Sequence, residues 1–177
     1  SVFCKERSMS STFLKLIEDK HILQEELSFD EIFTKSSNVG SIQLIEEIGI
    51  KKQQLFLSKL GLNEKLNLHG LSTVNNKLPN DWDHLASKFI SYGYGISISP
   101  ISLVSAYSSL VNGGIKIKPS IILNSERAQE KILNRSTSTK VNNLLKKVVD
   151  SGTGKKAKVN GLDVGGKTGT SRKLENG

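Results

Sequence analysis

The most informative part of this chain is Gly161-Leu162-Asp163-Val164-Gly165-Gly166-Lys167-Thr168-Gly169-Thr170, near its C-terminal end. Up to Thr168 it fits the phosphate-loop pattern G-x-x-x-x-G-K-[ST]. A phosphate loop requires a buried strand before it and a helix after it. Neither neighbour fits, because Lys155-Lys156-Ala157-Lys158 is too polar for a buried parallel strand and Ser171-Arg172-Lys173 has no apolar period. The phosphate loop is therefore the weaker of two interpretations.

The second interpretation makes Lys167-Thr168-Gly169-Thr170 a strand at the edge of an active site. A lysine and a hydroxyl group there can hold a carboxylate, and a glycine leaves room for a substrate to lie against the strand. A lone Lys-Thr-Gly also occurs in ordinary glycine-rich turns, so this interpretation depends on a second motif.

That second motif is Ser36-Ser37-Asn38. The capping-box spacing of Ser28-Phe29-Asp30-Glu31 predicts a helix before it. A stripe of Val39, Ile42, Ile45 and Ile48 predicts another helix after it, with Gly49 as its stop. Ser36 and Asn38 would then project from the junction of two helices into a cleft. The alternative is that they only cap a helix.

The rest of the chain is predicted to be mainly helical, with strand near its end. Helices are expected over residues 53–60, from Ser99-Pro100 to Asn112-Gly113-Gly114, and over residues 138–150. Residues 115–123 are expected to be extended, and residues 62–83 to be connecting structure.

Composition excludes several classes of function. The chain has 177 residues, one cysteine and a formal charge of +8, but its lysines are spread out and 6% of its residues are aromatic. No nucleic-acid motif is present, so a solvated basic surface is favoured over a nucleic-acid partner. The three histidines, at positions 21, 69 and 84, have no metal or triad spacing, and we expect neither a metal nor a cofactor. No apolar run could span a bilayer, and no signal peptide is evident.

In this order and spacing, the two motifs resemble the S-x-N and K-T-G motifs of penicillin-binding proteins and serine β-lactamases. Three stretches resemble class B penicillin-binding proteins of the division-specific transpeptidase type: Lys35-Ser36-Ser37-Asn38-Val39-Gly40, the segment from Tyr92-Gly93-Tyr94-Gly95 to Asn112-Gly113-Gly114, and Gly152-Thr153-Gly154-Lys155-Lys156-Ala157 with the Lys-Thr-Gly segment after it. The resemblance covers residues 28–173. We therefore predict a partial transpeptidase domain over residues 28–177, with residues 1–27 as an N-terminal part of the same domain.

One departure from the family pattern is important. The family's nucleophile is the serine of an S-x-x-K motif, and no serine of this chain has a lysine three positions later. Ser11-Thr12-Phe13-Leu14-Lys15 is one residue too long and lies too close to Ser36. We expect the chain to be a fragment that begins after the nucleophile helix, and not a degenerate enzyme.

The resemblance implies an α/β (α+β) fold, in which a helical subdomain with Ser36 and Asn38 lies beside an antiparallel sheet with Lys167. It implies peptidoglycan D,D-transpeptidation through a serine acyl-enzyme. Ser36 would relay protons, Asn38 would bind the substrate amide, and Lys167 would supply positive charge. Thr168 would bind the substrate carboxylate, Gly169 would leave room for the substrate, and the Thr170 amide would be an oxyanion donor.

The implied partners are stem peptides ending in D-alanyl-D-alanine, β-lactams and membrane proteins of a division complex. The implied location is the bacterial inner membrane, with this domain in the periplasm. A carboxypeptidase or β-lactamase would share both motifs. A non-catalytic β-lactam sensor or scaffold module of the same fold is the alternative from another class.

Overall fold

The computed structural model describes residues 4–5, 26–71 and 73–169. Within them, helices dominate and two short antiparallel strand pairs are present, β1 with β2 and β3 with β4. In chain order the elements are β1 (Cys4–Lys5), β2 (Glu26–Leu27), α1 (Phe29–Lys35), α2 (Asn38–Ile48), α3 (Ile50–Lys59), α4 (His84–Ser91), α5 (Pro100–Val111), β3 (Ile115–Ile117), β4 (Gln129–Lys131), α6 (Arg135–Asp150) and the 3-10 helix η2 (Lys155–Ala157).

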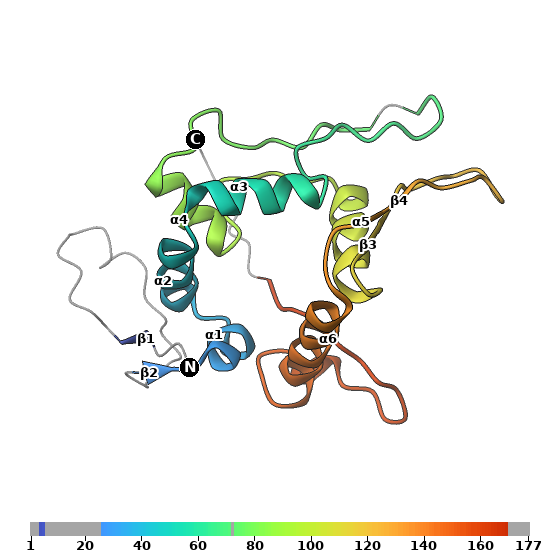
Figure 1. The fold of residues 1–177 in the computed structure, drawn as a ribbon. Helices are drawn as coiled ribbons and strands as arrows, with labels where there is room; N and C mark the ends of the chain where they lie inside the picture. Colours follow the sequence, from blue (N-terminus) through green and yellow to red (C-terminus); the bar gives the residue numbers. More distant parts are fainter. Residues whose placement is uncertain (1–3, 6–25, 72, 170–177) are drawn as a thin grey trace, which may run out of the picture.

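The helices follow one another along an arc that curves back on itself, and α6 lies beside α1 (Figure 1). Helix α6 packs against α1, and the Lys147 ammonium forms an ion pair with Asp30 there. Val148 and Val149 of α6 are 0% and 2% exposed. This contact between the two ends of the arc brings the C-terminal segment to the α1–α2 junction.

Two further contacts hold the middle of the arc together. Leu60, Leu62 and Ala106 form an apolar cluster between the end of α3 and α5. Gln53 of α3 is buried, and it accepts hydrogen bonds from Trp82 Nε1 (3.1 Å) and Ser87 Oγ (2.7 Å). The sequence Asp81-Trp82-Asp83 is therefore a turn with a packed tryptophan that leads into α4, whose N-cap is Asp83.

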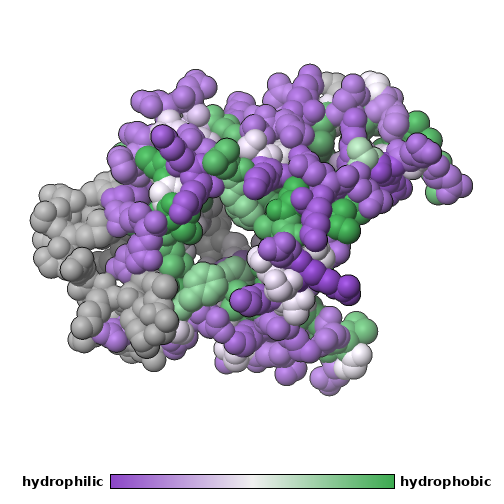
Figure 2. Space-filling model, in the orientation of Figure 1, coloured by the Kyte–Doolittle hydropathy of each residue, from purple (hydrophilic) through white to green (hydrophobic). Residues whose placement is uncertain are grey.

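An apolar area remains exposed on one face of the molecule, between polar margins (Figure 2). The exposed apolar residues of the structure include Leu103, Val104 and Tyr107 of α5, which are 46%, 63% and 39% exposed. In the part of the chain that the structure describes, no helix is long and apolar enough to cross a bilayer.

Three of the predicted elements differ from the structure in extent. Helix α3 begins at Ile50, three residues before the expected start at residue 53. Only Ile115–Ile117 of the expected extended segment 115–123 forms a strand, paired with Gln129–Lys131. Pro119 has no N–H for a strand ladder, and Ser120 Oγ closes a turn by accepting a hydrogen bond from the Ile122 amide at 3.0 Å. Helix α6 begins at Arg135, three residues earlier than expected, because Asn134 has extended backbone and serves as its N-cap.

Candidate active site

The predicted site begins at the junction of α1 and α2. Ser36 is the C-cap of α1, with φ 58° and ψ 47°, and Ser37 is the N-cap of α2. Ser37 is buried, and its Oγ accepts a hydrogen bond from the Gly40 amide at 2.8 Å. Asn38 is the first residue of α2. The side chain that caps the start of α2 is therefore that of Ser37, while the Ser36 side chain remains exposed.

The left-handed backbone of Ser36 is unusual for a residue other than glycine and costs on the order of 1–2 kcal/mol. The Ser36 amide bonds to the Phe33 carbonyl at 3.3 Å, and the Ser37 amide bonds to the Ile32 carbonyl at 3.0 Å. These bonds end α1 and hold Ser36 in place. A strained residue at this position is consistent with a functional role.

The start of α1 is fixed by the capping box that the sequence predicts. Glu31 Oε2 accepts from the Ser28 amide at 3.0 Å and from Ser28 Oγ at 2.8 Å. Lys35 lies one turn further on, 3.3 Å from Glu31 Oε1. The hydrogen bonds from the Ser28 backbone and side chain, followed by the contact with Lys35, lower the pKa of Glu31 to about 2.

We expect this capping box to make α1 sensitive to acid. Because the folded pKa of Glu31 is below its usual value of 4.5, its stabilising contribution is complete above pH 4.5 and is lost as the pH falls towards 2. Glu31→Gln should lower the free energy of unfolding at neutral pH, and this difference from wild type should shrink at acidic pH. Denaturant unfolding at several pH values measures it. Glu47→Gln, on the exposed side of α2, controls for the lost charge. A difference that does not change with pH would contradict the expectation.

Lys167 reaches the junction from the other end of the chain. After α6, the chain passes through η2 and returns along α6, where the Gly166 amide donates to the Leu145 carbonyl at 3.1 Å. This contact places Lys167 beside α1. Its Nζ donates a hydrogen bond to Ser36 Oγ at 2.7 Å, across 131 positions of sequence. The structure thus brings together the two motifs that the sequence analysis paired.

The surroundings of Lys167 change its acidity. Its Nζ lies 5.9 Å from the centroid of the Phe33 ring, on the last turn of α1. Burial lowers the pKa of Lys167 from the usual lysine value of 10.5. A partly dehydrated lysine bonded to a serine hydroxyl can stabilise negative charge on that oxygen more strongly than an exposed lysine can.

The remaining predicted residues follow Lys167. Thr168 Oγ1 lies 2.7 Å from Thr153 Oγ1, and Gly169 has open space where a Cβ would be. Thr170 lies outside the described residues, as do residues 1–3 and 6–25. The sequence motifs assign no role to Thr153. Its signal was present in Gly152-Thr153-Gly154, which contributed to the family resemblance.

The expected strand at the Lys-Thr-Gly segment is absent from the described residues. Residues 163–169 have no regular secondary structure. A strand needs a neighbouring strand, and here the segment bonds instead to α6 through Gly166 and to Ser36 through Lys167. The phosphate-loop interpretation also fails, since Lys155–Ala157 form η2 and the described residues 151–160, directly before the loop, contain no strand.

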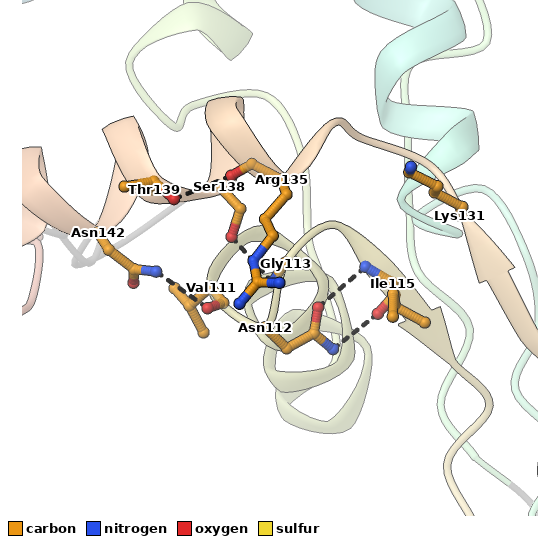
Figure 3. A pocket seen from close by; sticks show the side chains of 9 residues that line it. All are labelled: Val111, Asn112, Gly113, Ile115, Lys131, Arg135, Ser138, Thr139 and Asn142. Atoms are coloured by element: carbon orange, nitrogen blue, oxygen red, sulfur yellow. Dashed lines mark hydrogen bonds between the residues drawn. The ribbon is translucent and has the colours of Figure 1, made fainter.

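A cavity of about 700 Å³ lies at the N-terminal end of α6 (Figure 3). Its wall includes Arg135 and Ser138 of α6 together with Asn112 at the end of α5. Asn112 closes the turn before β3 by bonding to both the amide and the carbonyl of Ile115. None of the predicted site residues lines this cavity, so it is separate from the Ser36–Lys167 site. Among the described residues no cluster of three metal-ligating side chains is found.

The chain belongs to the family of penicillin-binding protein transpeptidase domains, whose family model matches residues 4–177. It is 31% identical over 171 residues to the probable peptidoglycan D,D-transpeptidase FtsI of Caulobacter vibrioides, covering 91% of this chain and 28% of that protein. It is 33% identical over 165 residues to the probable peptidoglycan D,D-transpeptidase PenA of Neisseria meningitidis, with the same two coverages. The resemblance to class B penicillin-binding proteins is thereby confirmed.

Solved structures confirm the fold. The transpeptidase domain of Burkholderia pseudomallei penicillin-binding protein 3 superposes with a TM-score of 0.77 at 24% identity, covering 86% of this chain and 48% of that one. A peptidoglycan glycosyltransferase from Burkholderia ambifaria gives a TM-score of 0.77 at 26% identity, covering 84% and 49%. The chain therefore spans about half of these solved chains and under a third of the Caulobacter and Neisseria relatives.

Proposed function

We propose that this chain supplies part of the active site of a peptidoglycan D,D-transpeptidase that works through a serine acyl-enzyme. The observation that carries the proposal is the 2.7 Å hydrogen bond from Lys167 Nζ to Ser36 Oγ. A lysine ammonium bonded to a serine hydroxyl can pass protons and stabilise charge during acyl transfer.

Each site residue then has a chemical role. Ser36, supported by Lys167, carries a proton to the departing amine. Asn38, at the start of α2, binds the amide of the stem peptide. Thr168 donates its hydroxyl hydrogen to the C-terminal carboxylate of that peptide, and Lys167 attracts the same carboxylate. Gly169 leaves space for the substrate, and the Thr170 amide is one of the oxyanion donors.

The acylated serine in this proposal belongs to an S-x-x-K motif that these 177 residues do not contain. Its oxygen attacks the carbonyl between the two D-alanines, forms an ester and releases D-alanine as the amine, which takes up a proton. An amine of a second peptide strand then attacks the ester. The new amide is the cross-link, and the serine regains its proton. A β-lactam reacts in the first step, when its strained amide opens.

The biological setting is part of the same proposal. The substrate is a stem peptide ending in D-alanyl-D-alanine, β-lactams are inhibitors, and the partners are membrane proteins of the division complex. The site faces the periplasm from an anchor in the inner membrane. A relative from Mycobacterium, penicillin-binding protein 3, has been solved in complex with ampicillin.

Covalent labelling by a fluorescent penicillin tests this function on the complete product of the source gene. We expect a labelled band that disappears when the serine of the S-x-x-K motif becomes alanine. Labelling that survives this change would contradict the acyl-enzyme mechanism. A folded protein that has the motif and is never labelled would overturn the enzyme proposal and favour the scaffold module.

A further inference from the structure

Thr153 makes the only side-chain hydrogen bond found for Thr168 among the described residues. Its Oγ1 lies 2.7 Å from Thr168 Oγ1, and either oxygen can be the donor. Both side chains are exposed, so nothing buries the pair or explains it as core packing. The contact lies next to the Lys167–Ser36 bond and joins the loop after α6 to the Lys-Thr-Gly segment.

The backbone of Thr153 is held rigidly. Its amide donates to the Thr34 carbonyl of α1 at 3.1 Å. On either side, the Gly152 amide donates to the Lys147 carbonyl at 3.0 Å and the Gly154 amide donates to the Val148 carbonyl at 2.9 Å. Thr153 is therefore fixed to both α1 and α6, although it lies in a loop. The same helix α1 carries Ser36 at its C-terminal end, so Thr153 connects the positions of both motifs.

The hydrogen-bonding capacity of the two hydroxyl groups limits how they can bind a carboxylate. A threonine hydroxyl has one hydrogen to donate, and an ionised carboxylate can only accept. If Thr168 gives its hydrogen to the substrate and keeps its contact with Thr153, its oxygen must accept from Thr153. The bound state then has one arrangement, in which Thr153 donates to Thr168 and Thr168 donates to the carboxylate.

We propose that Thr153 is a positioning residue that orients the Thr168 hydroxyl towards the carboxylate of the substrate or β-lactam. This inference rests on the proposed function and adds a residue to it. Thr153 acts through Thr168 and does not touch the reacting carbonyl. Its removal should weaken the initial, reversible binding of a β-lactam and leave the chemical step of acylation unchanged.

The test is the acylation of the complete gene product by benzylpenicillin, resolved into the dissociation constant K of the first complex and the acylation rate constant k2. We expect Thr153→Val to raise K about tenfold and to leave k2 unchanged. A tenfold change corresponds to the loss of one hydrogen bond in a row of bonds that ends on a charged carboxylate. Thr153→Ser retains the hydroxyl and should restore K. Thr153→Ala should match Thr153→Val, and Thr139→Val removes another exposed threonine hydroxyl as a matched control.

A double-mutant cycle separates this role from general damage. Thr168→Val should raise K. Adding Thr153→Val to it should raise K no further, because Thr153 acts only through the Thr168 hydroxyl. Three results would each overturn the inference. They are an increase in K in the double variant that is the product of the two single increases, an unchanged K in Thr153→Val, and a failure of Thr153→Ser to restore K. If wild-type protein is not acylated at all, the proposed function fails and the inference fails with it. If wild type is acylated and Thr153→Val behaves identically, only the inference fails.

Discussion

Lys167→Ala is expected to lower the rate of acylation by penicillin about 10²–10³-fold in the complete gene product, the range measured for loss of one preorganised charge-stabilising donor. The hydrogen bond from Lys167 Nζ to Ser36 Oγ would be lost, and no other described side chain donates to this oxygen. Partial burial and the Phe33 ring keep water away from Lys167, so water would replace its charge poorly. Stopped-flow or gel-based labelling with a fluorescent penicillin measures the rate.

Lys156→Ala is the matched control, because Lys156 is an exposed lysine of η2 and its loss changes the net charge equally. Equal labelling rates in the two variants would show that Lys167 is not part of the acylation machinery. The pH profile adds a second criterion. Since burial lowers the pKa of Lys167, labelling should decline on the alkaline side at a pH below the usual lysine value of 10.5. Lys167→Arg, whose guanidinium stays protonated, should move this decline upward.

Gly152→Ala is expected to lower the free energy of unfolding by about 3 kcal/mol. A Cβ at this position would lie 2.5 Å from the Thr34 carbonyl oxygen, 2.9 Å from Val148 Cα and 3.0 Å from the Val148 carbonyl oxygen. All three atoms belong to the backbone, so no change of rotamer relieves the contact. Helices α1 and α6 would have to separate, and the loop with Thr153 would move with them. Thermal and denaturant unfolding measure the loss.

Gly166→Ala provides the comparison for stability, because no heavy atom lies within 4 Å of a Cβ built there. It adds the same methyl group to the same C-terminal segment. We expect its unfolding transition to stay close to that of wild type. A similar loss of stability in both variants would show that the alanine effect does not come from the α1–α6 contact.

Much of the helical structure could be predicted from local chemistry. The capping box at Ser28 and Glu31, the stop at Gly49 and the start at Ser99-Pro100 all appear where the sequence indicates. Such signals depend on residues a few positions apart, since a capping side chain bonds to the backbone of its own first turn. The two motifs and the three longer stretches that resemble class B penicillin-binding proteins likewise predicted the family.

The strand predictions were less accurate. β-branched residues indicated extended structure over residues 115–123, and the active-site interpretation made the Lys-Thr-Gly segment a strand. Strands need partners, however, and partners are set by distant parts of the chain. Only Ile115–Ile117 found one among the described residues. The lysine segment bonds to α6 and to Ser36 instead.

The sequence alone predicted which side chains form the site, namely a serine and an amide between two helices and a lysine followed by a hydroxyl. It did not show that Ser36 has a left-handed backbone, that Ser37 is the residue that caps α2, or that Thr153 bonds to Thr168. The first two features are local to the α1–α2 junction, and the two threonines lie 15 positions apart. The contact that depends most on the tertiary structure is the bond from Lys167 to Ser36, which crosses 131 positions where α6 packs against α1. Local hydrogen bonds determine where the helices begin and end. The burial of Val148 and the close approach of the α1 and α6 backbones at Gly152 bring Lys167 to Ser36.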